Sequence, residues 1–598
     1  MNEKDFWRYT VLGVIFVFAG VFLVFRMFSL QVNDYVDVFH EQEENYLVSQ
    51  KIIYPERGKI VDRWGHLLAG NQKVYEVKIN LHEVENPETL ALVLSGVLGR
   101  NFDEIYEIAN QKTKEGDSGI IIVDNYVTPE MINQIEEIRE ELEVSPQKGS
   151  NGITHSLKGL EYNALLFRSY PEKDLASNIL GFVNYEYKGY FGIEGYYNQI
   201  LGHEGPEWFE EPTDPRQVVN MPELPKGASL VLTIDREIQA STESILDAAI
   251  KSSGANAGTI VVMDPRTGEI LAMASSPRID VNNFSEELGS FDKEKKFNMA
   301  IHSYEPGSVF KIFTMAAGLD SGAVEPDTSF IDNGFFEYGG VTIYNWDRGA
   351  WGPQDMTGCL QHSLNVCLAW VASELGEGRF YDYMQRFGFG HITGIGLAGE
   401  EAGRLKRMTD DDWYSADLAT NAFGQGVLVT PIQMLMAASA IANDGQMVVP
   451  WIIYAVSDGE SQYVSSPQYA GNPISAETAH TLSLMLTKSL EKEASSALVP
   501  GYKVAGKTGT AEISIPGKGY VSNLTNASFL GWGPTDDPQF MVYVWLQKPT
   551  SSPWGSVVAA PVFSQVARRL VVMLNIPPDD VHLQIGQMEE KPSSATGN

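Results

Sequence analysis

The feature that most constrains this chain is an apolar run close to its N-terminus. Residues Tyr9–Phe25 form 17 consecutive positions without a charged side chain. As an α-helix this run would span about 26 Å, at the short end of a bilayer crossing, and Met27, Phe28 and Leu30 can extend it. The residues that follow lack the small side chains of a signal-peptide cleavage site. We therefore expect a retained transmembrane anchor over residues 9–31.

Basic residues around the anchor predict its orientation. Lys4 and Arg8 precede the run, whereas after Arg26 no Lys or Arg occurs before Lys51. Basic residues favour the cytoplasmic side of a membrane, so residues 1–8 are expected in the cytoplasm. Since no later apolar stretch is expected to reach the length of a second span, nearly the whole chain should lie outside the cytoplasm, at the cell membrane.

Charge and cysteine content exclude several classes of function. The chain has 43 Lys plus Arg against 77 Asp plus Glu, a net charge of −34 that repels nucleic acid. Two cysteines, Cys359 and Cys367, cannot supply a disulfide scaffold or a thiolate zinc cluster. On a single helix they would lie about 12 Å apart along the axis, too far to bridge. We interpret both as small buried apolar residues.

A segment rich in Pro, Gly and charge, near residues 212–226, divides the exported chain. The first part, residues 42–225, mixes strand and helix patterns. The second, residues 226–576, contains runs of strands with helices grouped between them, which favours an α+β domain over alternating βαβ units. The polar tail, residues 577–598, is expected to be disordered.

Hydrophobic periodicity predicts individual elements in both parts. In the first part we expect a strand at 73–81 and helices at 87–98 and 128–142, the latter capped by Thr128. In the second part the expected elements are a strand and long helix over 229–253, hairpins over 259–277 and 526–547, and a helix over 561–575.

Three clusters of polar residues could carry chemistry, and the first is Ser308 with Lys311. The two residues share a face at the head of a nearly all-apolar helix expected to end at Gly322. A desolvated lysine can take the proton of a serine hydroxyl, and the helix N-terminus can stabilise an oxyanion. The alternative is a capping serine beside a snorkelling lysine. The spacing is weak evidence alone, because it recurs at Ser145/Lys148, Ser290/Lys293 and Ser489/Lys492.

The second and third clusters lie further along the chain. Ser363 and Asn365 interrupt an apolar stretch and would point the same way only in a loop or extended turn; they could equally satisfy local backbone groups. In residues 501–513, a predicted strand, Gly506 and Gly509 flank Lys507 and Thr508. Glycine in a strand interior indicates close approach of a backbone or ligand. The alternative for this lysine is protection of a sheet edge.

Taken together, Ser308-x-x-Lys311, Ser363-x-Asn365 and Lys507-Thr508-Gly509 resemble, in this order, the signature motifs of penicillin-binding proteins and serine β-lactamases. The resemblance extends over roughly Arg57 to Asn575. Residues 57–69, 168–183 and 191–205 resemble the N-terminal, dimerisation-type module of class B penicillin-binding proteins, and residues 230–239, 260–277 and 422–434 resemble their transpeptidase domain.

This resemblance implies a peptidoglycan D,D-transpeptidase with an antiparallel sheet flanked by helices. Ser308 would attack the stem peptide and form an acyl-enzyme, and Lys311 would be the base. Ser363 would relay the proton to the leaving amine, and Asn365 would hold the peptide and orient Lys311. β-Lactams would be expected to acylate Ser308. No metal or cofactor is expected.

The resemblance implies that the third motif binds substrate. Lys507, Thr508 and Gly509 would receive the terminal carboxylate of the donor peptide or of a β-lactam. The backbone N–H groups of Ser308 and Thr510 would form the oxyanion hole. Further partners implied are a second stem peptide as acceptor, a polytopic membrane glycosyltransferase, and division or elongation proteins.

Several alternatives stay open at this point. A D,D-carboxypeptidase shares all three motifs, and a β-lactamase would need a water-activating residue that we do not recognise between Asn365 and Lys507. The chain could also act mainly as a scaffold for a membrane glycan polymerase. Residues 497–513 look slightly more like the division type than the elongation type.

Overall fold

The computed structural model divides the chain into two compact units. The smaller unit joins Met1–Glu56 to Glu204–Pro225, and the larger comprises Arg57–His203 and Lys226–Asn598. The described residues are 3–32, 48–53, 55–113, 119–146, 148, 153–202, 207–212, 226–290, 296–515, 517 and 519–581. Most of the expected boundary segment at 212–226, Lys293 and most of the expected tail lie outside these ranges.

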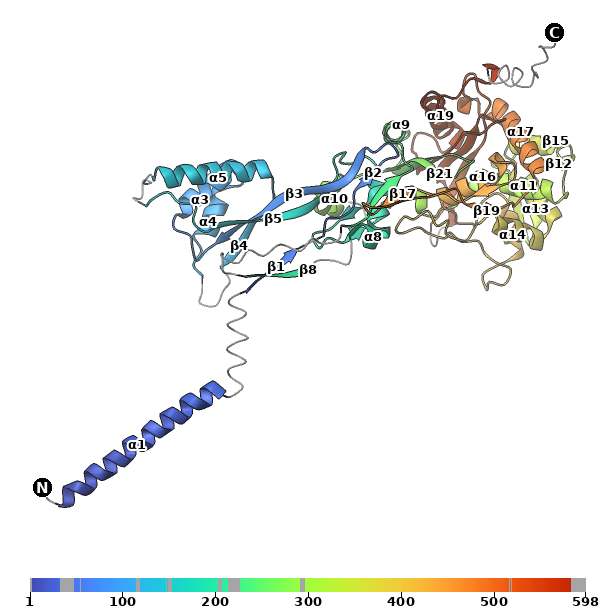
Figure 1. Cartoon of the computed structure of the whole chain (residues 1–598). Coiled ribbons are helices and arrows are strands. Elements are labelled where there is room, and N and C mark those ends of the chain that lie inside the picture. The colour runs from blue at the N-terminus through green and yellow to red at the C-terminus, as the bar shows by residue number, and fades with distance from the viewer. Residues whose placement is uncertain are drawn as a thin grey trace, which may run out of the picture. The chain divides into compact units, whose positions relative to one another are not determined.

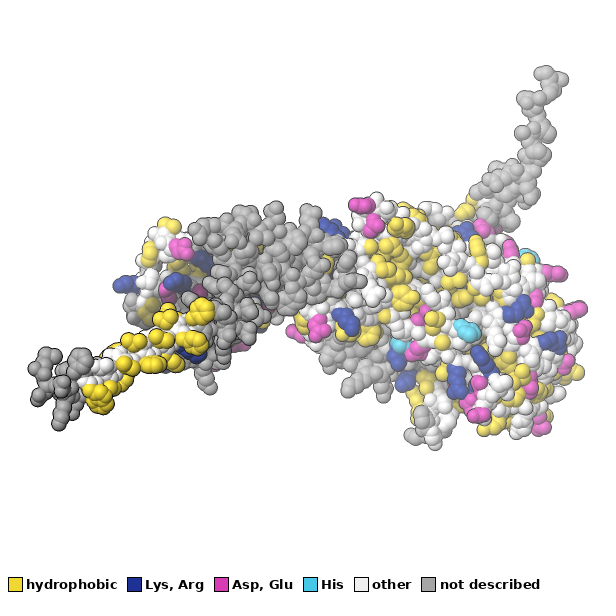
Figure 2. All heavy atoms as spheres, turned by 60° about the horizontal axis from the view of Figure 1, so that its bottom comes forward, with side chains coloured by type: hydrophobic (Ala, Val, Ile, Leu, Met, Phe, Trp, Pro, Cys, Tyr) yellow, Lys and Arg dark blue, Asp and Glu magenta, His cyan; other side chains and the backbone are white. Residues whose placement is uncertain are grey.

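The smaller unit contains the expected apolar helix. Helix α1 (Glu3–Val32) is continuous, and its segment Thr10–Phe28 has a mean hydropathy of 2.5 with none of it buried. Figure 2 shows hydrophobic side chains, in yellow, along most of α1. Strand β1 (Val48–Ile53) pairs antiparallel with β8 (Glu207–Pro212). Within the described part of this unit, nothing buries the apolar surface of α1. Helix α1 is therefore a candidate membrane anchor.

A second stretch also has the length and composition of a membrane span, so the expectation of a single such stretch was wrong. It is Gly555–Met573, with a mean hydropathy of 1.3. It comprises two helices, α18 (Gly555–Val558) and α19 (Ala560–Met573), and half of it is buried. Because α19 packs its apolar face on a sheet, we interpret it as a core helix.

The first part of the larger unit is a small α+β layer. Strand β3 (Leu67–Asn80) pairs antiparallel with both β4 (Ile120–Val127) and β5 (Leu160–Ser169), which confirms the expected strand and extends it. The expected helices are also confirmed, as α3 (Pro87–Leu98) and α5 (Pro129–Val144). Thr128 accepts the hydrogen bond of the Met131 N–H, as expected of an N-cap. Helix α4 (Phe102–Ala109) completes this layer and its separate apolar core.

The sheet of this layer continues into the rest of the unit, and β5 branches from its main path by pairing with β3. Its strands run in the order β18-β17-β9-β2-β3-β4. The short β2 (Ile60–Val61) lies parallel to β9 (Ser229–Leu232), and β17 (Ile453–Ser457) pairs with β9 on the other side. The N-terminal layer and the C-terminal part therefore share backbone hydrogen bonds.

The centre of the C-terminal part, where Figure 1 labels β21, is a five-stranded antiparallel sheet. Its strand order is β11-β10-β22-β21-β20. Its strands are β10 (Ala257–Met263), β11 (Ile270–Ser276), β20 (Ala505–Ile515), β21 (Gly519–Gly533) and β22 (Phe540–Gln547). Both expected hairpins are confirmed, β10 with β11 and β21 with β22. Every residue of β10 is buried, because both faces of the sheet are covered.

Helices cover the two faces and form two cores. Helix α9 (Arg236–Ser253) and α19 pack on the face that presents Ile260 and Val262. The helices on the opposite face are α11 (Lys311–Asp320), α13 (Asn365–Leu375), α16 (Pro431–Ala442) and α17 (Ala476–Glu493). This arrangement of an antiparallel sheet between helices confirms the expected α+β class.

Short elements connect these layers. The helices are α6 (Ser177–Leu180), α7 (Gly192–Tyr196), α8 (Asn198–Gly202), α10 (Phe284–Ser290), α12 (Met356–Gln361), α14 (Glu377–Arg386) and α15 (Ser415–Asn421). The strands are β6 (Phe182–Val183), β7 (Gly189–Tyr190), β12 (Phe330–Asp332), β13 (Phe335–Tyr338), β14 (Val341–Tyr344), β15 (Gly352–Gln354), β16 (Met447–Val448), β18 (Gln462–Val464) and β19 (Tyr469–Gly471). Among the described residues, the 3₁₀ turns are Val281–Asn283, Met299–Ile301, Gly307–Phe310 and Ser495–Ala497.

The two cysteines correct a sequence-based expectation. Cys359 and Cys367 are both buried, as expected, but they form a disulfide with a Cα–Cα distance of 6.0 Å. The expectation of no bridge assumed one continuous helix. Instead Cys359 lies in α12 and Cys367 in α13, and the chain reverses at Ser363, whose φ is +53°. The reversal shortens the separation to one that a disulfide can span.

Candidate active site

Ser308 and Lys311 lie at the start of a buried helix, as the sequence predicts. Ser308 is in a 3₁₀ turn (Gly307–Phe310, element η3), and Lys311 is the first residue of α11. Gly307 has φ +59°, and a Cβ there would lie 2.9 Å from Thr510 O and from Ala511 Cβ. Only glycine therefore lets this turn approach the strand that carries Thr510. Ser308 itself is half-buried.

Lys311 is fully buried, at 0% exposure, and its ammonium contacts the second motif. Its Nζ donates to Ser363 O at 2.5 Å and to Asn365 Oδ1 at 2.8 Å, and lies 3.2 Å from Ser363 Oγ. Burial, and then the like charge of Lys507, hold the pKa of Lys311 well below its ordinary value. Within the described residues, no hydrogen bond joins Lys311 to the Ser308 hydroxyl.

The second motif occupies the reversal between α12 and α13. Ser363 is the residue with positive φ, and Asn365 begins α13, so the two side chains face Lys311 from a turn, as the sequence predicts. Asn365 also donates through Nδ2 to Tyr344 O at 3.0 Å. Its amide is thereby oriented with the oxygen toward Lys311. Ser363 and Asn365 therefore do more than satisfy local backbone groups, which was the alternative interpretation of these two residues.

The third motif lies on β20, the edge strand of the five-stranded sheet. Lys507 is buried, and its Nζ donates to Ser363 Oγ at 3.0 Å and to Thr508 O at 3.2 Å. A buried lysine bound to Ser363 does not act as an exposed charge at a sheet edge. A Cβ on Gly509 would lie 2.5 Å from Val309 Cγ2 and 3.1 Å from Pro306 O. Glycine therefore permits the close backbone approach that the sequence predicts.

The side chain of Thr510 makes a contact within the fold. Its Oγ1 accepts the Gly555 N–H at 3.0 Å, which attaches the N-terminus of α18 to β20. The hydroxyl is thus engaged in the fold. The expected oxyanion-hole group of Thr510 is its backbone N–H, which this contact does not occupy.

The sequence motifs converge at one place, and their competitors do not. Ser363 contacts both lysines, although Lys311 and Lys507 are 52 and 144 residues away from it in the chain. By contrast Ser489 donates to Met485 O within α17, and Ser145 follows the end of α5. The contacts therefore bring together the second and third motifs and Lys311 of the first, whereas Ser145 and Ser489 lie elsewhere, after α5 and within α17.

Two features beside the site were not selected from the sequence. The first is the Cys359–Cys367 disulfide, which brackets Ser363 and Asn365. The second is a pair of half-exposed indoles, Trp346 and Trp554, in edge-to-face contact with ring centroids 5.2 Å apart. Trp346 Nε1 donates to His362 O, next to Ser363. For the disulfide, the sequence signal was a pair of cysteines that flank the polar motif. The indole pair gives no such signal, because it depends on a contact between segments far apart in the sequence.

Comparison with known proteins agrees with this geometry. A family model described as "Penicillin binding protein transpeptidase domain" matches residues 258–568, and "Penicillin-binding Protein dimerisation domain" matches residues 52–207. Stage V sporulation protein D of Bacillus subtilis is 32% identical over 88% of this chain and 79% of its own length. Probable peptidoglycan D,D-transpeptidase PbpC of Pseudomonas aeruginosa is 28% identical over 97% of both chains.

Solved structures give the same answer. The crystal structure of penicillin-binding protein 3 from Mycobacterium tuberculosis, complexed with aztreonam, matches with a TM-score of 0.65 and 26% identity, over 88% of this chain and 98% of that one. A dimerisation domain ahead of the transpeptidase domain is the arrangement expected from the resemblance. This chain therefore belongs to the penicillin-binding protein transpeptidase family, as a class B penicillin-binding protein.

Proposed function

We propose that this protein is a peptidoglycan D,D-transpeptidase that cross-links stem peptides through an acyl-enzyme on Ser308. The observation that carries the proposal is the buried ammonium of Lys311, three residues after Ser308 and hydrogen-bonded to Ser363 and Asn365. A lysine whose pKa is lowered can be neutral and accept a proton. The name of the Pseudomonas aeruginosa relative, which spans the same length, supports this activity.

In the proposed acylation, the Ser308 hydroxyl oxygen attacks the carbonyl carbon of the penultimate D-alanine. Neutral Lys311 takes the hydroxyl proton. The C–N bond to the terminal D-alanine then breaks, and its nitrogen receives a proton through the Ser363 hydroxyl, which lies 3.2 Å from Lys311 Nζ. Asn365 keeps Lys311 oriented and holds the peptide.

Substrate binding is assigned to β20 and the helix start. Lys507 and Thr508, beside Gly509, receive the terminal carboxylate of the donor, since Lys507 supplies a buried positive charge next to Ser363. The backbone N–H groups of Ser308 and Thr510 stabilise the oxyanion of the tetrahedral intermediate. The close approach of η3 to β20 that Gly307 and Gly509 permit supports this pairing.

The second half-reaction resolves the acyl-enzyme. The amine of an acceptor stem peptide attacks the ester carbonyl, forms the cross-link and returns the proton to Ser308. A β-lactam would acylate the same serine and leave slowly. The aztreonam complex of the Mycobacterium tuberculosis relative supports β-lactam binding by this fold.

The arrangement of the chain at the membrane is also part of the proposal. Residues 1–8 lie in the cytoplasm and residues 9–31 span the membrane. Residues 42–225 form the dimerisation-type module and residues 226–576 the transpeptidase domain, outside the cytoplasm. The matches at 52–207 and 258–568 support this division. The partners are a polytopic glycosyltransferase and division proteins, and the subtype is the division type.

Product analysis tests the reaction. Purified full-length protein in detergent is incubated with glycan strands carrying pentapeptides, and the released peptides are separated by mass. The proposal predicts cross-linked dimers and free D-alanine in equal amounts, both lost in Ser308→Ala and retained in Ser145→Ala. Tetrapeptide without dimer would instead identify a D,D-carboxypeptidase.

A further inference from the structure

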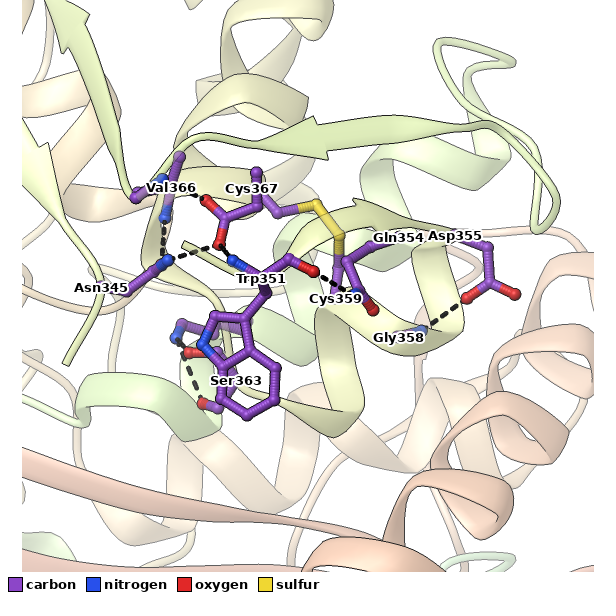
Figure 3. Close-up of a disulfide and its surroundings, with 12 residues drawn as sticks. Asn345, Trp351, Gln354, Asp355, Gly358, Cys359, Ser363, Val366 and Cys367 are labelled. Carbon is purple, nitrogen blue, oxygen red and sulfur yellow. Dashed lines mark hydrogen bonds between the residues drawn. A yellow bond between two sulfur atoms is a disulfide. The ribbon is translucent and has the colours of Figure 1, made fainter. Parts of the chain in front are cut away.

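The Cys359–Cys367 disulfide closes the short segment that carries two of the proposed active-site residues. Cys359 lies in α12 and Cys367 in the first turn of α13. Figure 3 shows the bridge joining these helices, with Ser363 in the same view. Ser363 and Asn365 are both inside the covalent loop. The bridge therefore limits how far the two helix ends, and the turn between them, can separate.

The turn needs a restraint because its conformation is unfavourable. Ser363 has φ +53°, a region that residues with a Cβ rarely adopt. Two backbone hydrogen bonds hold the reversal, Ser363 N to Leu360 O at 3.2 Å and Leu364 N to Cys359 O at 3.0 Å. The acceptor of the second bond is the carbonyl oxygen of a bridged residue, Cys359. A residue in such a conformation persists only where the surrounding structure fixes it.

Electrostatics adds a second reason. Two lysines converge on one hydroxyl, with Lys311 Nζ 3.2 Å and Lys507 Nζ 3.0 Å from Ser363 Oγ. Their mutual repulsion lowers as the turn moves outward or water enters between them. Lys311 also relies on Ser363 O and Asn365 Oδ1 for its other contacts. Movement of the turn would therefore change the surroundings of the proposed base.

The two sides of the turn are attached differently. The α13 side is held by Asn345, whose Oδ1 accepts the Val366 N–H at 3.3 Å (Figure 3). The Nδ2 of Asn345 donates to Asp332 Oδ2 at 2.7 Å. On the α12 side, the Asp355 carboxylate caps the helix through Gly358 N at 2.6 Å. The disulfide is the covalent connection between these two anchored helices, and both sulfur-bearing residues are fully buried.

We propose that Cys359 and Cys367 are positioning residues, whose disulfide holds Ser363 and Asn365 against Lys311 in the conformation that acylation requires. This inference rests on the proposed function, because it concerns the same site. Burial of both residues means that the bridge acts as a permanent restraint in the folded protein rather than one exchanged with thiols in solution.

The test measures acylation by a fluorescent penicillin as a function of pH. Full-length protein in detergent is compared with Cys359→Ala, Cys367→Ala and the double variant. Each single substitution already removes the bridge, so all three variants should lose the second-order acylation rate by a similar factor, about tenfold or more. In a plot of acylation rate against pH, the rise on the acid side should also move to higher pH in these variants. The reason is that a looser turn admits water to Lys311, which raises the pKa of Lys311.

A control separates positioning from loss of stability. Leu570→Ala removes a buried side chain from α19, on the opposite face of the sheet, and should lower Tm while leaving the acylation rate and its pH dependence unchanged. If the cysteine variants behave like Leu570→Ala, the positioning role is overturned. Losses that add between the two single variants would also overturn it, because they would reflect packing alone.

Three further outcomes distinguish the positioning role from the proposed function. If the alanine variants do not fold and Cys→Val variants do not either, the bridge is a folding requirement and the positioning role is overturned. If wild-type protein is not labelled, or Ser308→Ala is labelled equally well, the proposed function fails first. Labelled wild type with unaltered cysteine variants contradicts only the positioning role.

Discussion

At the scale of single residues, the site depends on two buried lysines that face the same hydroxyl. Lys311 is completely buried and Lys507 nearly so, and both contact Ser363. The cost of burying an ammonium and the repulsion between the two both favour a neutral Lys311. A serine hydroxyl beside a neutral amine can lose its proton in the transition state, whereas one beside an ammonium cannot.

The first prediction concerns the pH dependence of acylation. The rate should rise with pH as Lys311 loses its proton, with a midpoint below the ordinary lysine value. Lys507→Gln removes the like charge, so the pKa of Lys311 rises and the midpoint moves to higher pH. Stopped-flow acylation by a penicillin across pH measures this. Lys492→Gln, at an exposed lysine of α17, should leave the midpoint unchanged, and an unmoved midpoint in Lys507→Gln would refute the coupling.

At the scale of elements, the site depends on how closely η3 and β20 approach. Gly509 stands where a Cβ would contact Val309 and Pro306. The second prediction is that Gly509→Ala forces β20 away from Ser308, costs about 1–3 kcal/mol of unfolding free energy, and reduces acylation at least tenfold. Denaturant unfolding and penicillin labelling measure the two effects. Gly96→Ala, in α3 with open space around it, should be neutral or stabilising. Full labelling of Gly509→Ala would contradict the account.

The third prediction concerns Glu401, which lies in a loop that packs beside η2, the 3₁₀ turn Met299–Ile301. Burial raises the pKa of Glu401, but hydrogen bonds from Ser303 and His302 outweigh it and lower the pKa to about 2. A depressed carboxyl pKa stabilises the fold above its unfolded value near 4.5, and this stabilisation is lost as pH falls toward 2. Because Glu401 is 37% exposed, its contribution is about 1 kcal/mol.

Glu401→Gln should therefore lower the unfolding free energy by that amount at pH 7. The difference from wild type should shrink as pH falls from about 4.5 toward about 2. Urea unfolding at several pH values tests this directly. A difference that stays constant down to acid pH would show that the carboxylate charge is not what stabilises the loop.

Elements were predicted more completely than the contacts between them. The hairpin of β10 and β11 follows from two apolar runs around a Pro/Gly turn, which are neighbours in sequence. The disulfide was missed because it depends on the backbone reversal at Ser363, and neither cysteine spacing nor helical periodicity encodes a positive φ there. The Lys507–Ser363 contact joins residues 144 apart, so only the family resemblance, and not local pattern, brought the motifs together.

At the scale of the whole molecule, a buried charge cluster ties the N-terminal layer to the short helices beside it. Glu194 on α7 is fully buried, and its carboxylate accepts from Arg57 Nε and Arg168 Nε, each at 2.6 Å. Arg168 also donates to Gly58 O at 2.7 Å. The cluster thus joins the chain segment before β2, the end of β5 and α7. Such clusters are costly to break, since the partners left behind stay buried.

The fourth prediction follows from this cluster. Glu194→Gln leaves two buried arginines without their anion and should cost about 3–5 kcal/mol of unfolding free energy. Scanning calorimetry on full-length protein measures the change. Glu85→Gln, which removes an exposed ion pair with Lys158, should leave the transition unchanged within error. Equal Tm values for Glu194→Gln and wild type would contradict the structural role.

The most direct test of the central claim is to locate the covalent adduct. Full-length protein in detergent is labelled with a fluorescent penicillin, beside Ser308→Ala and Ser145→Ala, and the labelled peptide is identified by mass spectrometry. The account predicts one stable adduct on Ser308, absent from Ser308→Ala and intact in Ser145→Ala. An adduct on another residue, or label that fades within minutes by hydrolysis, would contradict it.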